Sequence, residues 1–196
     1  MLFVLTGNIQ IGKSRWLNRL VERLEDAGVE CFGVVTPGIW EAFTENGEKC
    51  YRKLGINAVL LPQKDTEVLG MKVEPAESPE SLASRTQSAS ADLAWSISDA
   101  AIERVNKHFA SSQAAAGLLV IDEVGRMELN HNQGFTEALS LLDAGPSGRY
   151  EHALIVVRSG LLEKAIERFS PAWGKPKIIH PTNENISLVH QTLLPS

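Results

Sequence analysis

Cysteine is scarce in this sequence, and long apolar runs are missing. The 196 residues include two cysteines, Cys31 and Cys50, whose spacing fits neither a metal site nor a redox motif. No apolar stretch approaches the ~20 residues that a membrane-spanning helix needs. The apolar stretch at the N-terminus is too short for a signal peptide. These absences predict a cytoplasmic protein with two reduced thiols and no membrane partner.

Basic residues are outnumbered by acidic ones. The chain has 19 Lys and Arg against 24 Asp and Glu, which gives a formal net charge of −5. This balance argues against a dedicated nucleic-acid surface, although it leaves room for a local basic patch. The hydrophobic share of 43% and the charged share of 22% are typical of a globular protein. We therefore expect one domain over residues 1–196 and no nucleic-acid partner.

The segment GNIQIGKS, residues 7–14, fits the phosphate-binding pattern G-x-x-x-x-G-K-[ST]. It follows a short apolar run, residues 2–5, and precedes a helical pattern, as the pattern requires. Glycines let the backbone bend around phosphates, so that successive N–H groups and the helix N-terminus bind the anion. We expect Lys13 to bind the β- and γ-phosphates and Ser14 to ligate Mg²⁺. The predicted nucleotide-binding residues are Gly7, Asn8, Ile9, Gln10, Ile11, Gly12, Lys13, Ser14 and Arg15.

The rest of the chain alternates strand and helix patterns. Apolar runs at 31–35, 118–121, 153–157 and 178–179 predict strands, and helical spacing follows most of them, with one helix expected to begin at Ser96. This order predicts a three-layer α/β/α fold of the P-loop NTPase class with a mainly parallel sheet. Residues 39–92 look irregular and predict small antiparallel strands at one edge, with a hairpin turn at Asn46-Gly47. Residues 74–90 predict either a solvated connector or a lid that carries Arg85.

Residues 118–123, LLVIDE, resemble a Walker B strand that ends in two carboxylates. Ligands of open α/β sheets bind at the carboxyl ends of strands, so Asp122 is expected to hold Mg²⁺ opposite Ser14. Glu123 is the candidate for polarising the attacking water. Arg158, at the carboxyl end of strand 153–157, is a candidate for stabilising transition-state charge, and Arg126 is a weaker one. No N-K-x-D string follows the D-x-x-G match, which argues against a Ras-like GTPase.

The block DEVGRMEL, residues 122–129, resembles the small nucleoside-triphosphatase family of thermophilic prokaryotes, which has a cancer-related form in animals. A generic Walker B strand does not predict four residues of this block, Gly125, Met127, Glu128 and Leu129. Looser similarities lie at 33–36, at 51–56 and at 181–185. The family usually has Asn-Arg near the C-terminus, whereas here Ile186 follows Asn185. The resemblance implies slow Mg²⁺-dependent hydrolysis of ATP, GTP and other nucleoside triphosphates to diphosphate and phosphate.

Two alternatives remain open at the sequence level. A small-molecule kinase would transfer the γ-phosphoryl group to an acceptor, but it usually needs an arginine-rich lid, and the middle of this chain has only Arg52 and Arg85. A nucleotide-dependent binding module would hydrolyse slowly for a protein partner, with Trp40 and Trp173 as candidates for an exposed partner surface. For Glu128, the sequence leaves open a supporting role in the site or a position at a helix start.

Overall fold

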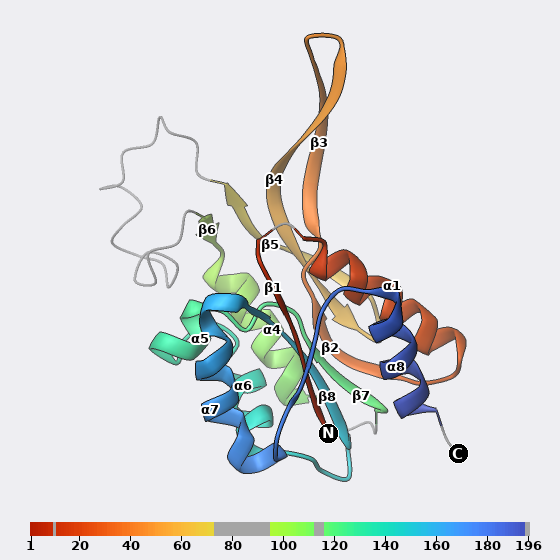
Figure 1. The fold of residues 1–196 in the computed structure, drawn as a ribbon. Helices are drawn as coiled ribbons and strands as arrows, with labels where there is room; N and C mark the ends of the chain where they lie inside the picture. Colours follow the sequence, from red (N-terminus) through yellow and green to blue (C-terminus); the bar gives the residue numbers. More distant parts are fainter. Residues whose placement is uncertain (10, 73–94, 112–115, 195–196) are drawn as a thin grey trace.

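The described residues of the computed structural model, 1–9, 11–72, 95–111 and 116–194, form one nine-stranded sheet (Figure 1). The strands follow the order β6-β5-β4-β2-β7-β8-β1-β9, and β3 pairs with β4 outside this path. The strand bounds are β1 Leu2–Gly7, β2 Cys31–Val35, β3 Gly38–Glu45, β4 Glu48–Leu61, β5 Asp65–Lys72, β6 Trp95–Ile97, β7 Leu118–Ile121, β8 His152–Arg158 and β9 Lys177–Ile179.

Five neighbouring strands, β2, β7, β8, β1 and β9, are parallel. Their side chains are apolar on both faces because helices cover both sides of the sheet. In β1, Phe3 and Leu5 pack into one core, while Leu2 and Val4 pack into the other. This alternation of buried residues explains why the strand reads as a continuous apolar run.

The helices form the two outer layers. Helices α1 (Lys13–Asp26) and α8 (Asn183–Leu193) cover one face. The other face is covered by α4 (Asp99–Ser111), α5 (Arg126–His131), α6 (Thr136–Ala144) and α7 (Leu162–Trp173), with a 3₁₀ turn, η1 (Ser159–Leu161), before α7. The expected three-layer α/β fold with a mainly parallel sheet is confirmed. Among the helices of the described residues, none is long and apolar enough to cross a membrane.

The remaining strands, β3 to β6, are antiparallel and lie at one edge of the sheet. Asn46 and Gly47 have φ angles of 52° and 82°, as a two-residue hairpin turn requires. The expected antiparallel strands at one edge and the hairpin turn at Asn46-Gly47 are confirmed. The strands are longer than expected, because β4 has 14 residues, and its hairpin with β3 projects beyond the rest of the sheet (Figure 1). The predicted connector or lid at 74–90, with Arg85, lies outside the described residues.

The start of α4 differs from the prediction. Ser96 does not begin this helix, because it pairs with Met71 in the ladder between β5 and β6. The helix begins at Asp99, and the Ser98 hydroxyl accepts a hydrogen bond from the Ala101 N–H at 3.2 Å. A serine just before the first helical residue satisfies a backbone donor of the first turn. The capping serine is therefore two residues later than the sequence pattern suggested.

The two thiols lie in different environments. Cys31 is fully buried in β2, and burial raises the pKa of its thiol to about 12, whereas Cys50 is half-buried on β4. Because the thiolate is the reactive form, only Cys50 is expected to react rapidly with Ellman's reagent at pH 8. We expect one fast thiol per native chain and two in guanidinium chloride. A Cys50→Ser variant should lose the fast reaction, and two fast thiols in the native protein would contradict this prediction.

Candidate active site

The segment 7–14 connects β1 to α1, as predicted. Gly7 and Gly12 have φ angles of 147° and 88°, values that favour glycine. Gly12 stands at the N-cap of α1, and its carbonyl accepts the Trp16 N–H at 2.9 Å. The first backbone donors of a 14-residue helix therefore follow directly on a glycine turn. This arrangement is suited to binding an anion.

Lys13 is folded back over the loop. Its ammonium group donates to the carbonyl of Gly7 at 2.8 Å and to that of Asn8 at 2.6 Å. Partial burial lowers the pKa of Lys13, and the nearby guanidinium of Arg158 lowers it further. A phosphate group near this ammonium would oppose both effects.

Asp122 follows β7 and is fully buried. Its Oδ2 accepts the backbone N–H of Thr36 at 2.9 Å, but its Oδ1 has no hydrogen-bond partner among the described residues. Burial and the neighbouring charge of Glu123 raise the pKa of Asp122 to about 6, while Thr36 and the Ser14 hydroxyl favour the charged form. A buried carboxylate oxygen without a donor is costly, and a cation between Asp122 and Ser14 would relieve that cost.

Glu123 has an unusual backbone conformation. Its φ angle is 67°, a value that costs a non-glycine residue roughly 1–3 kcal/mol. Hydrogen bonds hold the chain on both sides: the Asp122 N–H donates to Val34 at 3.0 Å and the Val124 N–H donates to Val156 at 2.9 Å. The strained residue is thus fixed between β2 and β8.

The Glu123 carboxylate meets Arg158 across the site. Arg158 is the last residue of β8, the strand between β1 and β7, and its guanidinium lies 3.2 Å from Glu123 Oε1. The Glu123 and Arg158 side chains are 38% and 48% exposed, so both remain accessible to a ligand. The structure therefore brings together Lys13, the adjacent pair Asp122 and Glu123, and Arg158, which come from three separate segments of the sequence.

The other predicted residues lie at the rim. Asn8, Ile9, Ile11 and Arg15 are exposed around the loop, where backbone groups rather than side chains would contact a phosphate. Gln10 lies outside the described residues. Arg126 is exposed on the first turn of α5.

Gly33 in β2 and Thr36, the residue after β2, contribute to the site although the sequence motifs did not assign them. Thr36 fixes the Asp122 carboxylate through its N–H, as described above. Gly33 lets β2 approach β7, because a Cβ at this position would lie 2.0 Å from the Val120 carbonyl oxygen. The loose family similarity at 33–36 was the signal in the sequence, but only the pairing of β2 with β7 explains it.

Glu128 is a residue at the start of helix α5. It is 7% exposed, and its two carboxylate oxygens accept the N–H groups of Gly125 at 2.9 Å and Phe135 at 3.1 Å. Burial raises the pKa of this carboxyl, and the two backbone donors oppose the rise. A Cβ at Gly134, where φ is 76°, would overlap the same carboxylate. Glu128 thus fixes the loop that leads from Glu123 into α5.

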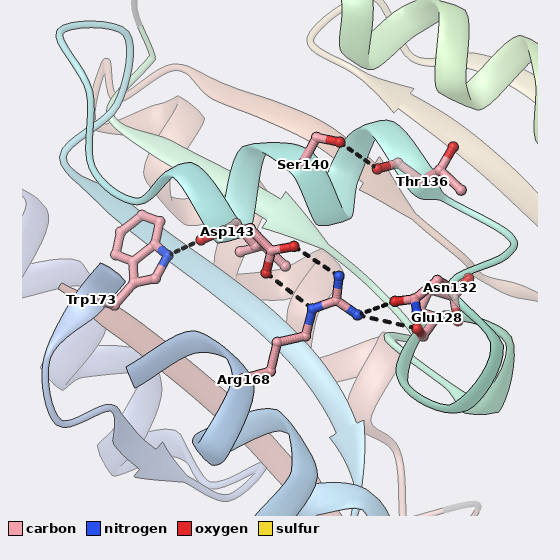
Figure 2. A network of polar contacts seen from close by, with 8 residues as sticks. Glu128, Asn132, Thr136, Ser140, Asp143, Arg168 and Trp173 are labelled. Atoms are coloured by element: carbon pink, nitrogen blue, oxygen red, sulfur yellow. Dashed lines mark hydrogen bonds and ion pairs between the residues drawn. The ribbon is translucent and has the colours of Figure 1, made fainter. Parts of the chain in front are cut away.

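A second polar network fastens this region to α7 (Figure 2). Arg168 donates to both oxygens of Asp143 at 3.0 and 2.7 Å and to Asn132 Oδ1 at 2.7 Å. Trp173 is 9% exposed and its indole N–H donates to the Leu142 carbonyl at 2.7 Å. Trp173 is therefore a packing residue, and the expectation of an exposed partner surface there is wrong. Trp40 is 49% exposed on the projecting hairpin.

Replacing Glu128 by glutamine is expected to destabilise the protein. An amide has one acceptor oxygen, so one of the two backbone donors would face an NH₂ group. Leaving a buried donor unpaired costs about 2 kcal/mol of unfolding free energy, which thermal unfolding would register as a fall of roughly 4–8 °C. The exposed Glu137→Gln on α6 is the matched control and should change stability little. Equal stability of the two variants would contradict this role of Glu128.

The C-terminal segment that resembles the family, residues 181–185, has a structural role at the start of α8. The Thr182 hydroxyl accepts the Asn185 N–H at 3.3 Å and caps α8, while the Thr182 carbonyl accepts the Trp16 indole N–H at 2.7 Å. The Asn185 amide donates to the His180 carbonyl at 3.0 Å. Ile186 is 3% exposed and packs in the core with α1. The position of the family's arginine is thus filled by an apolar residue that secures α8.

Comparison with known proteins agrees with this architecture. A search of curated proteins gave no significant match, and neither did a search of solved structures. A family model described as NTPase, however, matches residues 2–185. This range includes the segment 7–14, the β7 strand with its two carboxylates and the cap of α8. The chain therefore belongs to the NTPase family.

Proposed function

We propose that this protein hydrolyses nucleoside triphosphates, ATP and GTP among them, to the diphosphate and phosphate with Mg²⁺ as cofactor. The observation that carries the proposal is the meeting of the glycine turn and Lys13 with the strand-end carboxylates Asp122 and Glu123. The loop amides and the Lys13 ammonium would bind the β- and γ-phosphates. Lys13 would exchange its present acceptors, the carbonyls of Gly7 and Asn8, for phosphate oxygens.

The residues present fit a magnesium ion. Oxygen ligands are what Mg²⁺ prefers, and it usually takes one or two protein ligands together with phosphate and water. Ser14 and Asp122 offer such a set, with an Asp122 oxygen that lacks a donor. Among the described residues, no group of three or more His, Cys, Asp or Glu could hold a metal by itself, which agrees with a site completed by substrate phosphates. The ion would supply neutralising charge on the phosphates.

Glu123 and Arg158 would act on the water and on the developing charge. Glu123 would orient a water molecule for in-line attack on the γ-phosphorus and accept its proton. Arg158, now 3.2 Å from Glu123, would approach the γ-phosphate when nucleotide binds. The ion pair would then weaken and free one Glu123 oxygen for water. The fixed backbone of Glu123 favours this role, because it holds the carboxylate in one position.

The proposal is tested by phosphate release from a panel of ATP, GTP, CTP and UTP, with Mg²⁺ and with EDTA. We expect turnover of several nucleotides and its loss with EDTA. The absence of turnover for every nucleotide with Mg²⁺ would contradict the proposal.

Arg158→Ala is expected to lower the rate of phosphate release about 100-fold, in the range for removing one donor to transition-state charge. Arg158→Lys should recover part of the loss because it keeps the charge without the forked donor geometry. An exposed arginine on α1, Arg23, gives the matched control Arg23→Ala. A wild-type rate for Arg158→Ala would remove Arg158 from the mechanism.

A further inference from the structure

A cavity of about 400 Å³ adjoins the candidate site. Its lining includes three residues of that site, Lys13, Glu123 and Arg158, and two further residues of the loop, Asn8 and Ile9. The lining also includes six apolar residues from β4, β5, β6, α4 and the region after β7: Ile56, Leu69, Ile97, Ile102, Met127 and Phe135. Each of these six residues is less than a tenth exposed. The cavity is therefore a formed, largely apolar pocket.

The attacking water does not account for the whole of this pocket. An attacking water needs about 30 Å³, whereas the cavity has the size of pockets that hold small organic molecules. In the sheet, β2 and β7 lie between β4 and the P-loop strand β1. A triphosphate at residues 7–14 that reaches Glu123 would thus leave the β4–β6 side of the cavity open.

The charge at the mouth of the cavity indicates what kind of molecule fits. Arg126 lines the cavity, is exposed and forms no ion pair or hydrogen bond within the described residues. Lys13 adds a second positive charge to the lining, while Arg158 is paired with Glu123. Of the two acidic residues in the lining, Glu128 already accepts two backbone N–H groups and Glu123 is paired with Arg158. An acid group bound beside Arg126 would form an ion pair with its guanidinium, which has no partner within the described residues.

We propose that this cavity binds a small organic anion with an apolar body. The body lies against the six apolar side chains, and the acid group meets Arg126. The apolar body lies on the β4–β6 side of the cavity, whereas the nucleotide-binding loop contributes Asn8, Ile9 and Lys13 to the lining, and we expect both ligands to be bound together. The inference goes beyond the proposed hydrolysis and does not require it.

Two fluorescent dyes of nearly equal shape test the site. 1-Anilinonaphthalene-8-sulfonate carries an acid group, and N-phenyl-1-naphthylamine is its uncharged counterpart. We expect the sulfonate to bind the native full-length protein with one site per chain, more tightly than the amine, and equally well in saturating ADP. No saturable binding, equal affinity for both dyes, or displacement of the sulfonate by ADP would overturn the proposal.

Variants locate the dye. Leu69→Phe fills the cavity from β5 and should weaken binding of both dyes at least tenfold, while Val68→Phe, next to it on the exposed side of β5, should not. Arg126→Gln should weaken only the sulfonate, about fivefold, as expected for one exposed ion pair. Arg23→Gln is its control. Because Arg126 is exposed, its substitution does not threaten folding, and an unchanged sulfonate affinity in Arg126→Gln would overturn the assignment even if Leu69→Phe failed to fold.

Discussion

Lys13→Ala is expected to reduce kcat/KM for ATP about 10³-fold, the upper range for loss of one group that stabilises transferred charge. In the proposed complex, the Lys13 ammonium would contact the phosphates bound at the glycine turn. It donates to the carbonyls of Gly7 and Asn8, so it already lies over the loop. Both nucleotide affinity and turnover should fall, because the same charge acts in the ground state and in the transition state.

The control for Lys13→Ala is Lys175→Ala, which removes an exposed lysine beyond α7. Nucleotide affinity is measured by titration calorimetry and turnover by phosphate release. Circular dichroism checks that both variants fold. If Lys13→Ala hydrolysed ATP at the wild-type rate, the activity would lie elsewhere in the molecule.

Glu123→Gln is expected to lower the phosphate-release rate about 10³-fold while nucleotide affinity stays within a few-fold of wild type. The amide keeps the shape of the side chain but cannot accept the proton of the attacking water, a loss typical of general-base removal. This separation of turnover from binding distinguishes Glu123 from Lys13, whose loss affects both. Single-turnover phosphate release and calorimetric binding of ATP give the two quantities.

Glu163→Gln, on the exposed side of α7, is the matched control for Glu123→Gln. A slow rate in Glu123→Gln together with a large loss of ATP affinity would assign Glu123 to binding. An unchanged rate would show that another group orients the water.

The parallel half of the fold could be predicted from local pattern. Strands such as β1 and β7 are short apolar runs between turns, and α1 and α7 show helical spacing, so type and order follow from burial on both faces. The antiparallel edge was harder. In β3 and β4 the projecting hairpin is half exposed, and its mixed side chains lack the alternation that a sheet packed on one face produces.

The residues of the candidate site could be predicted from the sequence, but their arrangement in space could not. The P-loop pattern pointed to Lys13, and the strand-end position pointed to Asp122 and Glu123. The positive φ of Glu123, the unpaired oxygen of Asp122 and the contact with Arg158 depend on how β2 and β8 flank β7. Such long-range pairing leaves no trace in a local pattern, and the same is true of the cavity beside the site.

The most direct test is the ratio of phosphate to ADP formed by the wild-type protein from ATP and Mg²⁺ with no added acceptor. Hydrolysis predicts one phosphate for each ADP, with both products lost together in Lys13→Ala. ADP formation without matching phosphate, or turnover only after an acceptor is added, would contradict hydrolysis and favour phosphoryl transfer to another molecule.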